Sequence, residues 1–303
     1  MIEIGFCADN NYAMPCGVCI TSIFEHNKDN KIRVHILTNG FSEENKLRFQ
    51  KTAEKYNQII DIYIIDEKLL EGLPIISKRF SIMTYARLFF HDILDKSIDK
   101  VLYLDSDIYV AGNIVDLWNT DITDYAVGAI PDVCADDICD QNRIETYTPY
   151  INAGVLLMNL AKWREKNFTY KCIDFALTKK TQMQDQDAIN AVMGDNMYYL
   201  NMKYNLMIYY YQNPTSKLRL HKKRWSELEE AKKNPSVLHY TAAIKPWHKE
   251  YDLPKQDIYI DMIRKSQWSD YKIKYRNTGI QLLKYYIFNT LVKLKPIILK
   301  SFS

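Results

Sequence analysis

The segment Val101-Leu102-Tyr103-Leu104-Asp105-Ser106-Asp107 decides which fold the rest of the chain can form. It begins with a short apolar run, as expected for a strand buried on both faces, and two carboxylates follow at positions i and i+2. In an open α/β sheet, ligands bind beyond the carboxyl ends of the strands. Asp105 and Asp107 could therefore share one divalent cation, and oxygen ligands suit Mg²⁺ or Mn²⁺, which often also contact substrate phosphates. The alternative is a polar pair that closes a turn, because D-x-D by itself is a weak signal.

Strand-like and helix-like segments alternate on both sides of this motif. Runs rich in Val, Ile and Tyr predict strands at residues 2–7, 32–37, 59–65, 101–104, 125–130, 155–158, 197–200 and 237–239. Helical periodicity and capping residues predict helices at residues 12–26, 42–56, 82–94, 163–177, 187–193 and 225–232. This alternation predicts an α/β sheet covered by helices on both faces. The stretches 132–148 and 207–217 are expected to be loops, and loops of this length are often functional lids.

The charge of the chain is divided unevenly. The whole sequence of 303 residues has a formal net charge of +3, from 40 Lys and Arg against 37 Asp and Glu. Residues 271–303 hold seven of the basic residues and no acidic one, which leaves 33 basic and 37 acidic residues in the body. A net negative body is not built to hold nucleic acid, because phosphate contacts require clustered Lys and Arg. We expect one main α/β domain over residues 1–270 and a separate basic segment over residues 271–303.

The N-terminus and the cysteines indicate a reducing compartment. The first residues have neither the basic region nor the long apolar region of a signal peptide, and no stretch reaches the length of a membrane span. We therefore expect a cytoplasmic protein. Cys16 and Cys19 have the C-x-x-C spacing of a redox site or half of a zinc site, but no second pair follows. Because Cys19 also falls in the apolar rhythm of a helix, we interpret both as packing residues.

Further polar groups stand at the expected strand ends or on an apolar helix. His239 ends the strand 237–239, and Mn²⁺ accepts a nitrogen ligand more readily than Mg²⁺ does. Lys245, in the fragment Lys-Pro-Trp-His, could meet a phosphate as a point charge. Arg87 lies on a mostly apolar helix, where a buried cation needs an anionic partner. Each group alone is more often a cap, a turn residue or a surface residue.

Three polar fragments could contact a substrate. The fragment Tyr150-Ile-Asn-Ala-Gly154 brings an amide and a close backbone turn to the edge of the sheet. The fragment Gln184-Asp-Gln-Asp187 opens a helix with two amides and two carboxylates, which is suitable for binding hydroxyl groups. The fragment Ala8-Asp-Asn-Asn-Tyr12 follows the first strand with donors, acceptors and a ring suited to a ribose and a base.

Together, these fragments resemble the retaining glycosyltransferases of family 8. The similarity extends over residues 1–253 in order and spacing, and it combines D-x-D, N-A-G-V-L-L-x-N-L, Q-D-Q-D and H-Y-x-x-x-x-K-P-W. Within the family the match is nearest to bacterial lipopolysaccharide α-galactosyltransferases, with glycogenin and galactinol synthase as more distant relatives. The resemblance implies a GT-A fold, which is a Rossmann-like α/β domain with a mixed central sheet, here followed by a small helical C-terminal segment.

The resemblance also implies roles for particular residues. Mn²⁺, or alternatively Mg²⁺, would be held by Asp105, Asp107 and His239, and the diphosphate of a UDP-sugar by Lys245. The uridine would lie at Ala8, Asp9, Asn11 and Tyr12. The donor sugar would lie among Arg87, Asn152, Asp185 and Gln186, with Asp132 toward the acceptor. The closing loop has Ala242 where the family usually has Gly, and a positive φ at that position would be strained.

The implied reaction transfers galactose or glucose from UDP to a saccharide acceptor of a cell-surface glycan or glycolipid, with retention at the anomeric carbon. Retention allows double displacement through a nucleophile or front-face attack within an ion pair. Gln186 stands where a nucleophile would be sought, but a neutral amide is a poor nucleophile. We therefore favour front-face attack, with Gln186 and Asp185 as positioning groups.

Two other functions use parts of the same pattern. A non-catalytic relative that only binds a UDP-sugar would keep the motifs without turnover. A D-x-D phosphatase usually has Thr or Val at the position of Tyr109, and its motif usually opens the domain. Binding of NAD or of ATP at a P-loop requires glycine-rich motifs that the sequence lacks.

The C-terminal segment 271–303 combines positive charge with an apolar stripe. The stripe recurs at helical spacing and consists of Ile280, Leu283, Ile287, Leu291, Leu294 and Ile298. Pro296 and the dispersed Lys residues exclude a membrane span, whereas a basic amphipathic helix fits the surface of an anionic bilayer. The alternative is a helix packed on the body or on a second protomer, and the oligomeric state stays open. The tail favours a peripheral position at the inner face of the cytoplasmic membrane.

Overall fold

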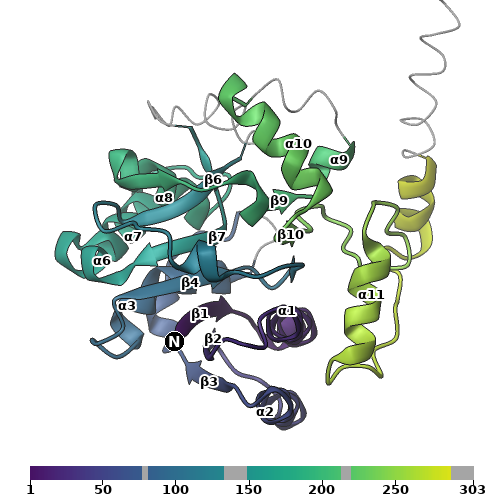
Figure 1. Cartoon of the computed structure of the whole chain (residues 1–303). Coiled ribbons are helices and arrows are strands. Elements are labelled where there is room, and N and C mark those ends of the chain that lie inside the picture. Colours follow the sequence, from purple (N-terminus) through teal and green to yellow (C-terminus); the bar gives the residue numbers. More distant parts are fainter. Residues whose placement is uncertain (77–80, 133–148, 213–219, 288–303) are drawn as a thin grey trace, which may run out of the picture.

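A mixed seven-stranded sheet forms the centre of the part of the chain that the computed structural model describes, namely residues 1–76, 81–132, 149–212 and 220–287 (Figure 1). Its strand order is β3-β2-β1-β4-β7-β6-β8. The strands are β1 (Ile2–Cys7), β2 (Ile32–Thr38), β3 (Ile59–Ile64), β4 (Lys100–Leu104), β6 (Val127–Pro131), β7 (Ile151–Asn159) and β8 (Met197–Tyr199). β1 to β4 run parallel, whereas β7 is antiparallel to both β4 and β6. The expected α/β architecture with a mixed sheet is confirmed.

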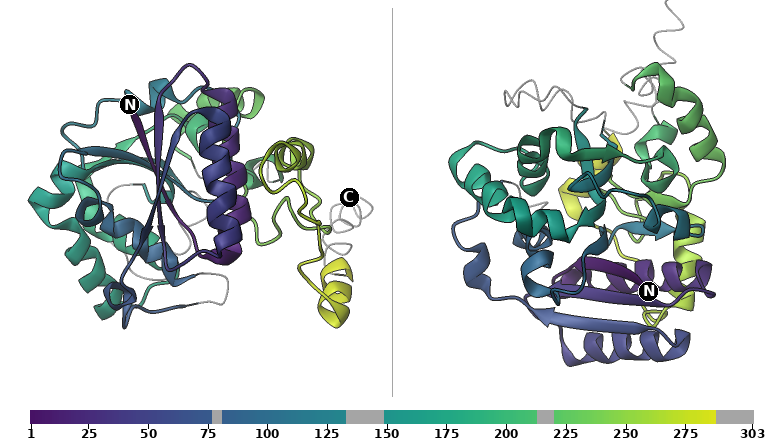
Figure 2. Two further views of the ribbon diagram at one scale, coloured as in Figure 1. Left: turned by 90° about the horizontal axis from the view of Figure 1, so that it is seen from below. Right: turned by 60° about the vertical axis from the view of Figure 1, so that its left-hand side comes forward.

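Side chains alternate between two cores, one on each face of this sheet. In β4, Leu102 and Leu104 pack in the core that contains α1 (Ala13–His26) and α2 (Glu43–Tyr56). Val101 and Tyr103 pack in the opposite core, which contains α6 (Leu160–Lys166), α7 (Phe168–Thr178) and α8 (Asp185–Met193). Figure 2 shows these two helical layers on either side of the sheet. A strand buried on both faces is continuously apolar, which is why the run 101–104 has no polar residue.

A small second sheet, of order β5-β10-β9, joins the motif to the C-terminal part of the domain. Its strands are β5 (Ile108–Val110), β9 (Leu206–Met207) and β10 (Val237–His239). β10 pairs antiparallel with β5, in a register that places His239 opposite Ile108. Because Ile108 directly follows Asp107, this pairing brings His239 to the two carboxylates. The strand β5 was not expected from the sequence.

The remaining helices are short. They are α3 (Phe90–Ile93), α4 (Val115–Trp118), α9 (Tyr209–Gln212), α10 (Trp225–Lys233) and α11 (Gln256–Lys265). The 3-10 helices cover Asn10–Tyr12, Glu67–Leu70, Ile82–Phe89, Gly194–Asn196, Met202–Tyr204 and Lys222–Arg224. Within the described residues, no helix has the length and apolar character needed to cross a membrane.

Several predicted elements differ from the observed ones. The single helix predicted at residues 163–177 is two helices, α6 and α7, because Asn167 adopts a left-handed conformation between them. The helix predicted at residues 82–94 is mostly a 3-10 helix, followed by one α-helical turn. The close turn expected before residue 155 is instead part of β7, which begins at Ile151.

The two expected loops lie partly outside the described residues. The prediction of a loop over residues 207–217 was wrong for the first part of this stretch, because Met207 belongs to β9 and α9 follows it. Residues 133–148 and 213–219 are outside the description, as are Cys134, Cys139 and the part of the tail stripe from Leu291 to Ile298. Residues 279–287 are helical, as predicted for the tail.

Cys16 and Cys19 lie in α1 as buried, unpaired thiols. Burial raises the pKa of both thiols, which keeps them in the unreactive protonated form. Both are part of the core beneath the sheet. These contacts agree with the interpretation of the two cysteines as packing residues.

Candidate active site

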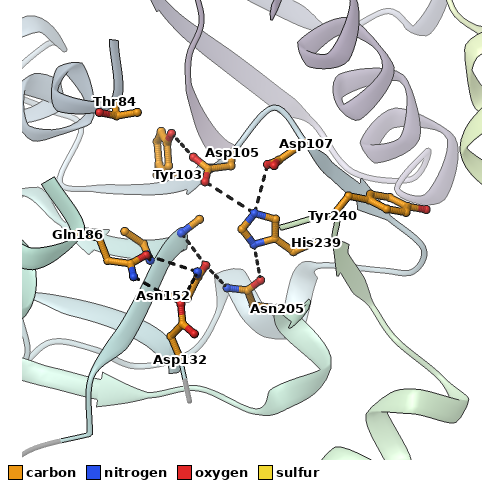
Figure 3. A network of polar contacts seen from close by, with 12 residues as sticks. Thr84, Tyr103, Asp105, Asp107, Asp132, Asn152, Gln186, Asn205, His239 and Tyr240 are labelled. Carbon is orange, nitrogen blue, oxygen red and sulfur yellow. Dashed lines mark hydrogen bonds and ion pairs between the residues drawn. The ribbon is translucent and has the colours of Figure 1, made fainter. Parts of the chain in front are cut away.

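Asp105, Asp107 and His239 meet at the carboxyl end of β4 (Figure 3). His239 Nε2 lies 3.2 Å from Asp107 Oδ1 and 3.8 Å from Asp105 Oδ2. One ligand atom from each of the three residues lies within 4.8 Å of the others, and no other cluster of this kind occurs in the described part of the chain. Two carboxylate oxygens and one imidazole nitrogen form a donor set that suits Mn²⁺. The residues predicted to hold a metal are therefore brought together by the fold.

The orientation of His239 is fixed by a neighbouring amide. The ring Nδ1 lies 2.9 Å from Asn205 Oδ1, which can only accept a hydrogen bond, so we assign the proton to Nδ1. Asn205 Nδ2 in turn donates to Asn152 Oδ1 at 2.9 Å, which fixes the orientation of the Asn205 amide. The Nε2 lone pair of His239 thus faces the carboxylates, as a metal ligand requires.

Gly154 leaves the space in which His239 lies. A Cβ atom at residue 154 would be 2.2 Å from His239 Cε1 and 2.9 Å from Asp105 Oδ2. The backbone of Gly154 also accepts a hydrogen bond from the Asp105 N–H at 2.8 Å. β7 therefore contributes to the candidate metal site through the absence of a side chain.

Lys245 supplies a positive charge beside the carboxylates. Its Nζ lies 2.5 Å from Asp107 Oδ2 and donates to the carbonyl of Tyr240 at 2.7 Å. Burial would raise the pKa of the Asp107 carboxyl, but Lys245 and His239 outweigh burial and lower it below its usual value. Asp107 is therefore an anion at neutral pH, available both to a cation and to the lysine.

Arg87 is a buried cation shared by two carboxylates. Its Nη2 lies 3.2 Å from Asp105 Oδ1 and its Nε lies 2.9 Å from Asp185 Oδ2. The Nε hydrogen is donated to the Thr84 carbonyl, so the contact with Asp185 is an ion pair rather than a second hydrogen bond. Nη1 donates to the Ala153 carbonyl at 2.6 Å. A buried Arg87 requires an anionic partner, and it has two, Asp105 and Asp185.

Burial raises the pKa of Asp185 to about 6, although Arg87 opposes this rise. Asp185 is 3% exposed and lies at the start of α8. Gln184, immediately before it, has φ 51° and ψ −120°, a backbone conformation that is costly for a residue with a side chain. The strained turn directs both Asp185 and Gln186 into the site.

Gln186, Asn152 and Asp132 form a buried network of amides and a carboxylate (Figure 3). Gln186 Oε1 accepts a hydrogen bond from the Ala153 N–H at 2.9 Å. Asn152 Nδ2 donates to Asp132 Oδ2 at 3.0 Å, and Gln186 Nε2 lies 3.4 Å from the same oxygen. These contacts hold the Gln186 carbonyl in place through the backbone of β7.

The segment after β1 forms a 3-10 turn that is capped by Asp9. Asp9 Oδ1 accepts hydrogen bonds from the N–H groups of Asn11 and Tyr12 at 2.9 and 3.2 Å, which closes the 3-10 turn after Ala8. The Tyr12 ring contacts the Trp247 ring edge-on, with centroids 6.2 Å apart. The predicted uridine segment and the Lys-Pro-Trp loop are therefore neighbours.

Ala242 does not carry the strain that a positive φ would impose. Among the described residues, positive φ occurs at four residues other than glycine, namely Asn57, Asn167, Gln184 and Lys255. The loop accommodates Ala242 in an ordinary conformation.

Three residues of the site were not identified from the sequence. Asn205 orients His239 but lies before a two-residue strand, where no local pattern distinguishes it. That position 154 has no room for a side chain follows from its contact with His239 of β10, and this contact cannot be read from the sequence around Gly154. Tyr103 donates to Asp105 Oδ1 at 2.6 Å and was detectable, because residues i and i+2 of a strand share a face.

Comparisons with known proteins agree with the fold and the motifs. The sequence model of Glycosyl transferase family 8 matches residues 3–251. General stress protein A of Bacillus subtilis is 27% identical over 276 residues, which are 89% of this chain and 95% of that protein. The lipopolysaccharide 1,3-galactosyltransferase of Salmonella typhimurium is 26% identical over 281 residues, which are 88% of this chain and 79% of that protein.

A solved structure supports the same assignment. The crystal structure of the galactosyltransferase LgtC, in complex with donor and acceptor sugar analogs, superposes with a TM-score of 0.80 and 29% identity. The match covers 88% of this chain and 96% of that one. The GT-A fold that the resemblance implies is confirmed.

Proposed function

This chain belongs to glycosyl transferase family 8, and we propose that it transfers a hexose, galactose or glucose, from a UDP-sugar to a saccharide acceptor of a cell-surface glycan or glycolipid. The observation that carries the proposal is the cluster of Asp105, Asp107 and His239 at the end of β4, with Lys245 beside it. The similarity to the lipopolysaccharide 1,3-galactosyltransferase of Salmonella typhimurium supports a hexose and an envelope glycan.

Asp105, Asp107 and His239 would hold Mn²⁺, with Mg²⁺ as an alternative, at the diphosphate of the donor. Such an ion acts as a Lewis acid toward the negative charge that develops on the departing UDP. Lys245 Nζ adds a fixed positive charge at the same place, since it already lies 2.5 Å from Asp107. These charges make protonation of the leaving group by a general acid unnecessary.

Arg87, Asn152, Asp185 and Gln186 would surround the donor sugar, and Asp132 would face the acceptor. The Gln186 carbonyl accepts a hydrogen bond from the backbone of β7, which further lowers the nucleophilicity of an amide oxygen that is already a poor nucleophile. This favours front-face attack by the acceptor, with Gln186 and Asp185 as positioning groups. Ala8, Asp9, Asn11 and Tyr12 would hold the uridine, with the backbone of Ala242 near the diphosphate.

A donor screen tests the proposal directly. UDP release is measured with Mn²⁺ across UDP-galactose, UDP-glucose and other UDP-sugars, for the natural chain and for Asp105→Asn and Asp107→Asn. Each Asn variant keeps the side-chain volume but loses the ligand charge, so metal-dependent transfer should fall at least about 1,000-fold while circular dichroism stays unchanged. Full activity of the Asn variants in EDTA would refute the metal assignment. Binding of UDP without turnover of any UDP-sugar would favour the non-catalytic alternative.

We also propose that the tail brings the enzyme to the inner face of the cytoplasmic membrane. Ile280, Leu283 and Ile287 lie on one face of the helical residues 279–287 and are 72%, 60% and 51% exposed. Their spacing of three and four residues supports a helix that lies on a bilayer. The Leu283→Glu variant should lose binding to vesicles that contain anionic lipid but keep transfer to a soluble acceptor. Vesicle binding equal to that of the natural chain would contradict this proposal.

A further inference from the structure

The C-terminal segment runs back over the loop that carries Lys245. Lys274 pairs with His248 in an isolated β-bridge, and its carbonyl accepts a hydrogen bond from the Lys249 N–H at 3.1 Å. The helix of residues 279–287 follows and stands outside the sheet, near α11 (Figures 1 and 2). The first part of the segment is therefore attached to the body rather than projecting from it.

Glu250 anchors the segment at one point of its backbone. Its carboxylate accepts hydrogen bonds from the N–H of Arg276 at 2.9 Å and from the N–H of Asn277 at 2.8 Å. The residue is 3% exposed. Burial would raise the pKa of Glu250, but hydrogen bonds from backbone N–H groups, including those of Asn277 and Arg276, lower the pKa below its ordinary value. The Arg276 backbone is thus held by a buried, charged acceptor, and such hydrogen bonds are among the stronger ones in proteins.

The Arg276 side chain points from this anchor to the loop 240–248, which carries Lys245. Its Nη1 donates a hydrogen bond to the carbonyl of Ala243, two residues before Lys245. The same loop is closed by a hydrogen bond from the Lys245 N–H to His248 Nδ1 at 2.9 Å. Arg276 therefore connects the anchored segment to the turn from which Lys245 reaches Asp107.

The charge of Arg276 also acts on the predicted nucleotide site. Burial and Asp107 raise the pKa of the Tyr12 hydroxyl, and the positive charge of Arg276 opposes that rise. Tyr12 contacts Trp247 of the same loop. The guanidinium group thus lies where it can influence both the loop and the segment that follows β1.

We propose that Arg276 is a positioning residue of the donor site, which holds the loop 240–248 so that Lys245 is presented to the diphosphate. The proposal rests on the proposed function, because it assumes that this loop binds the UDP moiety. It assigns the early part of the C-terminal segment to donor binding and not only to a membrane. The matching family model ends at residue 251, so Arg276 lies beyond the matched region.

The test measures UDP binding to the full chain by calorimetry in the presence of Mn²⁺. The Arg276→Ala variant should bind UDP about tenfold more weakly, because the loop 240–248 loses its hydrogen bond to the anchored segment. Its KM for the UDP-sugar should rise by a similar factor. At saturating donor the bound diphosphate itself keeps Lys245 in place, so kcat and the KM for the acceptor should change little. The Arg276→Lys variant keeps the charge and a donor and should recover most of the affinity. Lys272→Ala removes the same charge from the same segment and is the matched control.

The possible outcomes separate this proposal from the proposed function. UDP affinity of Arg276→Ala equal to that of Lys272→Ala would overturn the role of Arg276 and leave the proposed function intact, even if the melting temperature fell. Absence of UDP binding by the natural chain would overturn both proposals.

Discussion

Replacement of Gly154 by alanine should disable the metal site without unfolding the protein. The added Cβ would lie 2.2 Å from His239 Cε1 and 2.8 Å from His239 Nδ1. Carbon atoms in contact are normally about 3.5 Å apart, so the His239 ring would have to move away from residue 154 by about 1 Å or more. A metal ligand tolerates a displacement of only about 0.2 Å. His239 would therefore lose its place in the cluster, along with its hydrogen bond to Asn205 at 2.9 Å.

The expected magnitude is that of a lost ligand. We expect Mn²⁺ to bind about 100-fold more weakly, which corresponds to about 2.8 kcal/mol. Overpacking at a buried position should also lower the free energy of unfolding by about 1–3 kcal/mol, which a domain of this size can tolerate.

The assay is a Mn²⁺ titration of donor turnover, accompanied by direct Mn²⁺ binding and urea denaturation. Gly128→Ala is the matched control, since Gly128 lies in the adjacent strand β6 and the atoms nearest to its added Cβ would be side-chain carbons of Ile122 and Leu200 at 3.4 Å. The control should keep the Mn²⁺ affinity of the natural chain. A Gly154→Ala variant that binds Mn²⁺ as tightly as the control would refute the proposed packing of His239 against β7.

Three further variants test the groups around the cluster. Asn205→Ala removes the acceptor of His239 Nδ1, so Mn²⁺ should bind about tenfold more weakly and excess Mn²⁺ should restore turnover; unchanged Mn²⁺ binding in calorimetry would contradict this. Burial raises the pKa of Asp185 to about 6, so its contribution to the free energy of unfolding is largest near pH 4 and is lost as the pH rises through about 6. In urea denaturation, the natural chain should therefore lose roughly 3 kcal/mol of unfolding free energy relative to Asp185→Asn between pH 4 and 7, and a pH-independent difference between the two proteins would refute this prediction. Arg87→Met leaves Asp105 and Asp185 without their buried counter-ion and should cost about 3–5 kcal/mol of stability, and a loss below about 1 kcal/mol would show that the carboxylates find other partners.

The distribution of charge is consistent with a local rather than a broad anion site. The body is net negative, yet the site contains two cations, Arg87 and Lys245, each within 3.2 Å of a carboxylate. A metal-bound diphosphate needs such fixed charges at one point, not a basic surface. Arg276, one of the basic residues of the tail, contacts the loop of Lys245 through a hydrogen bond to the Ala243 carbonyl.

Much of the fold could be predicted because its signals are local. The buried run 101–104 of β4 is apolar throughout because both of its faces pack against helices, and the helix after Ser42 begins with a capped first turn. Where prediction failed, a tertiary or backbone effect overrode a periodic pattern. Asn167 divides one amphipathic run into two helices by adopting a left-handed conformation, which hydrophobic spacing does not reveal.

By itself, the sequence determined which kinds of ligand atoms are available and that two of them end a buried strand, since residue type and periodicity are properties of neighbours along the chain. The tertiary structure decided which of these atoms meet. His239 reaches Asp107 only because β10 pairs antiparallel with β5, and it fits only because β7 presents Gly154 there. Strand partner and register are chosen by packing over long sequence separations, so no local pattern encodes them. The contact of Arg276 with the loop 240–248 has the same origin.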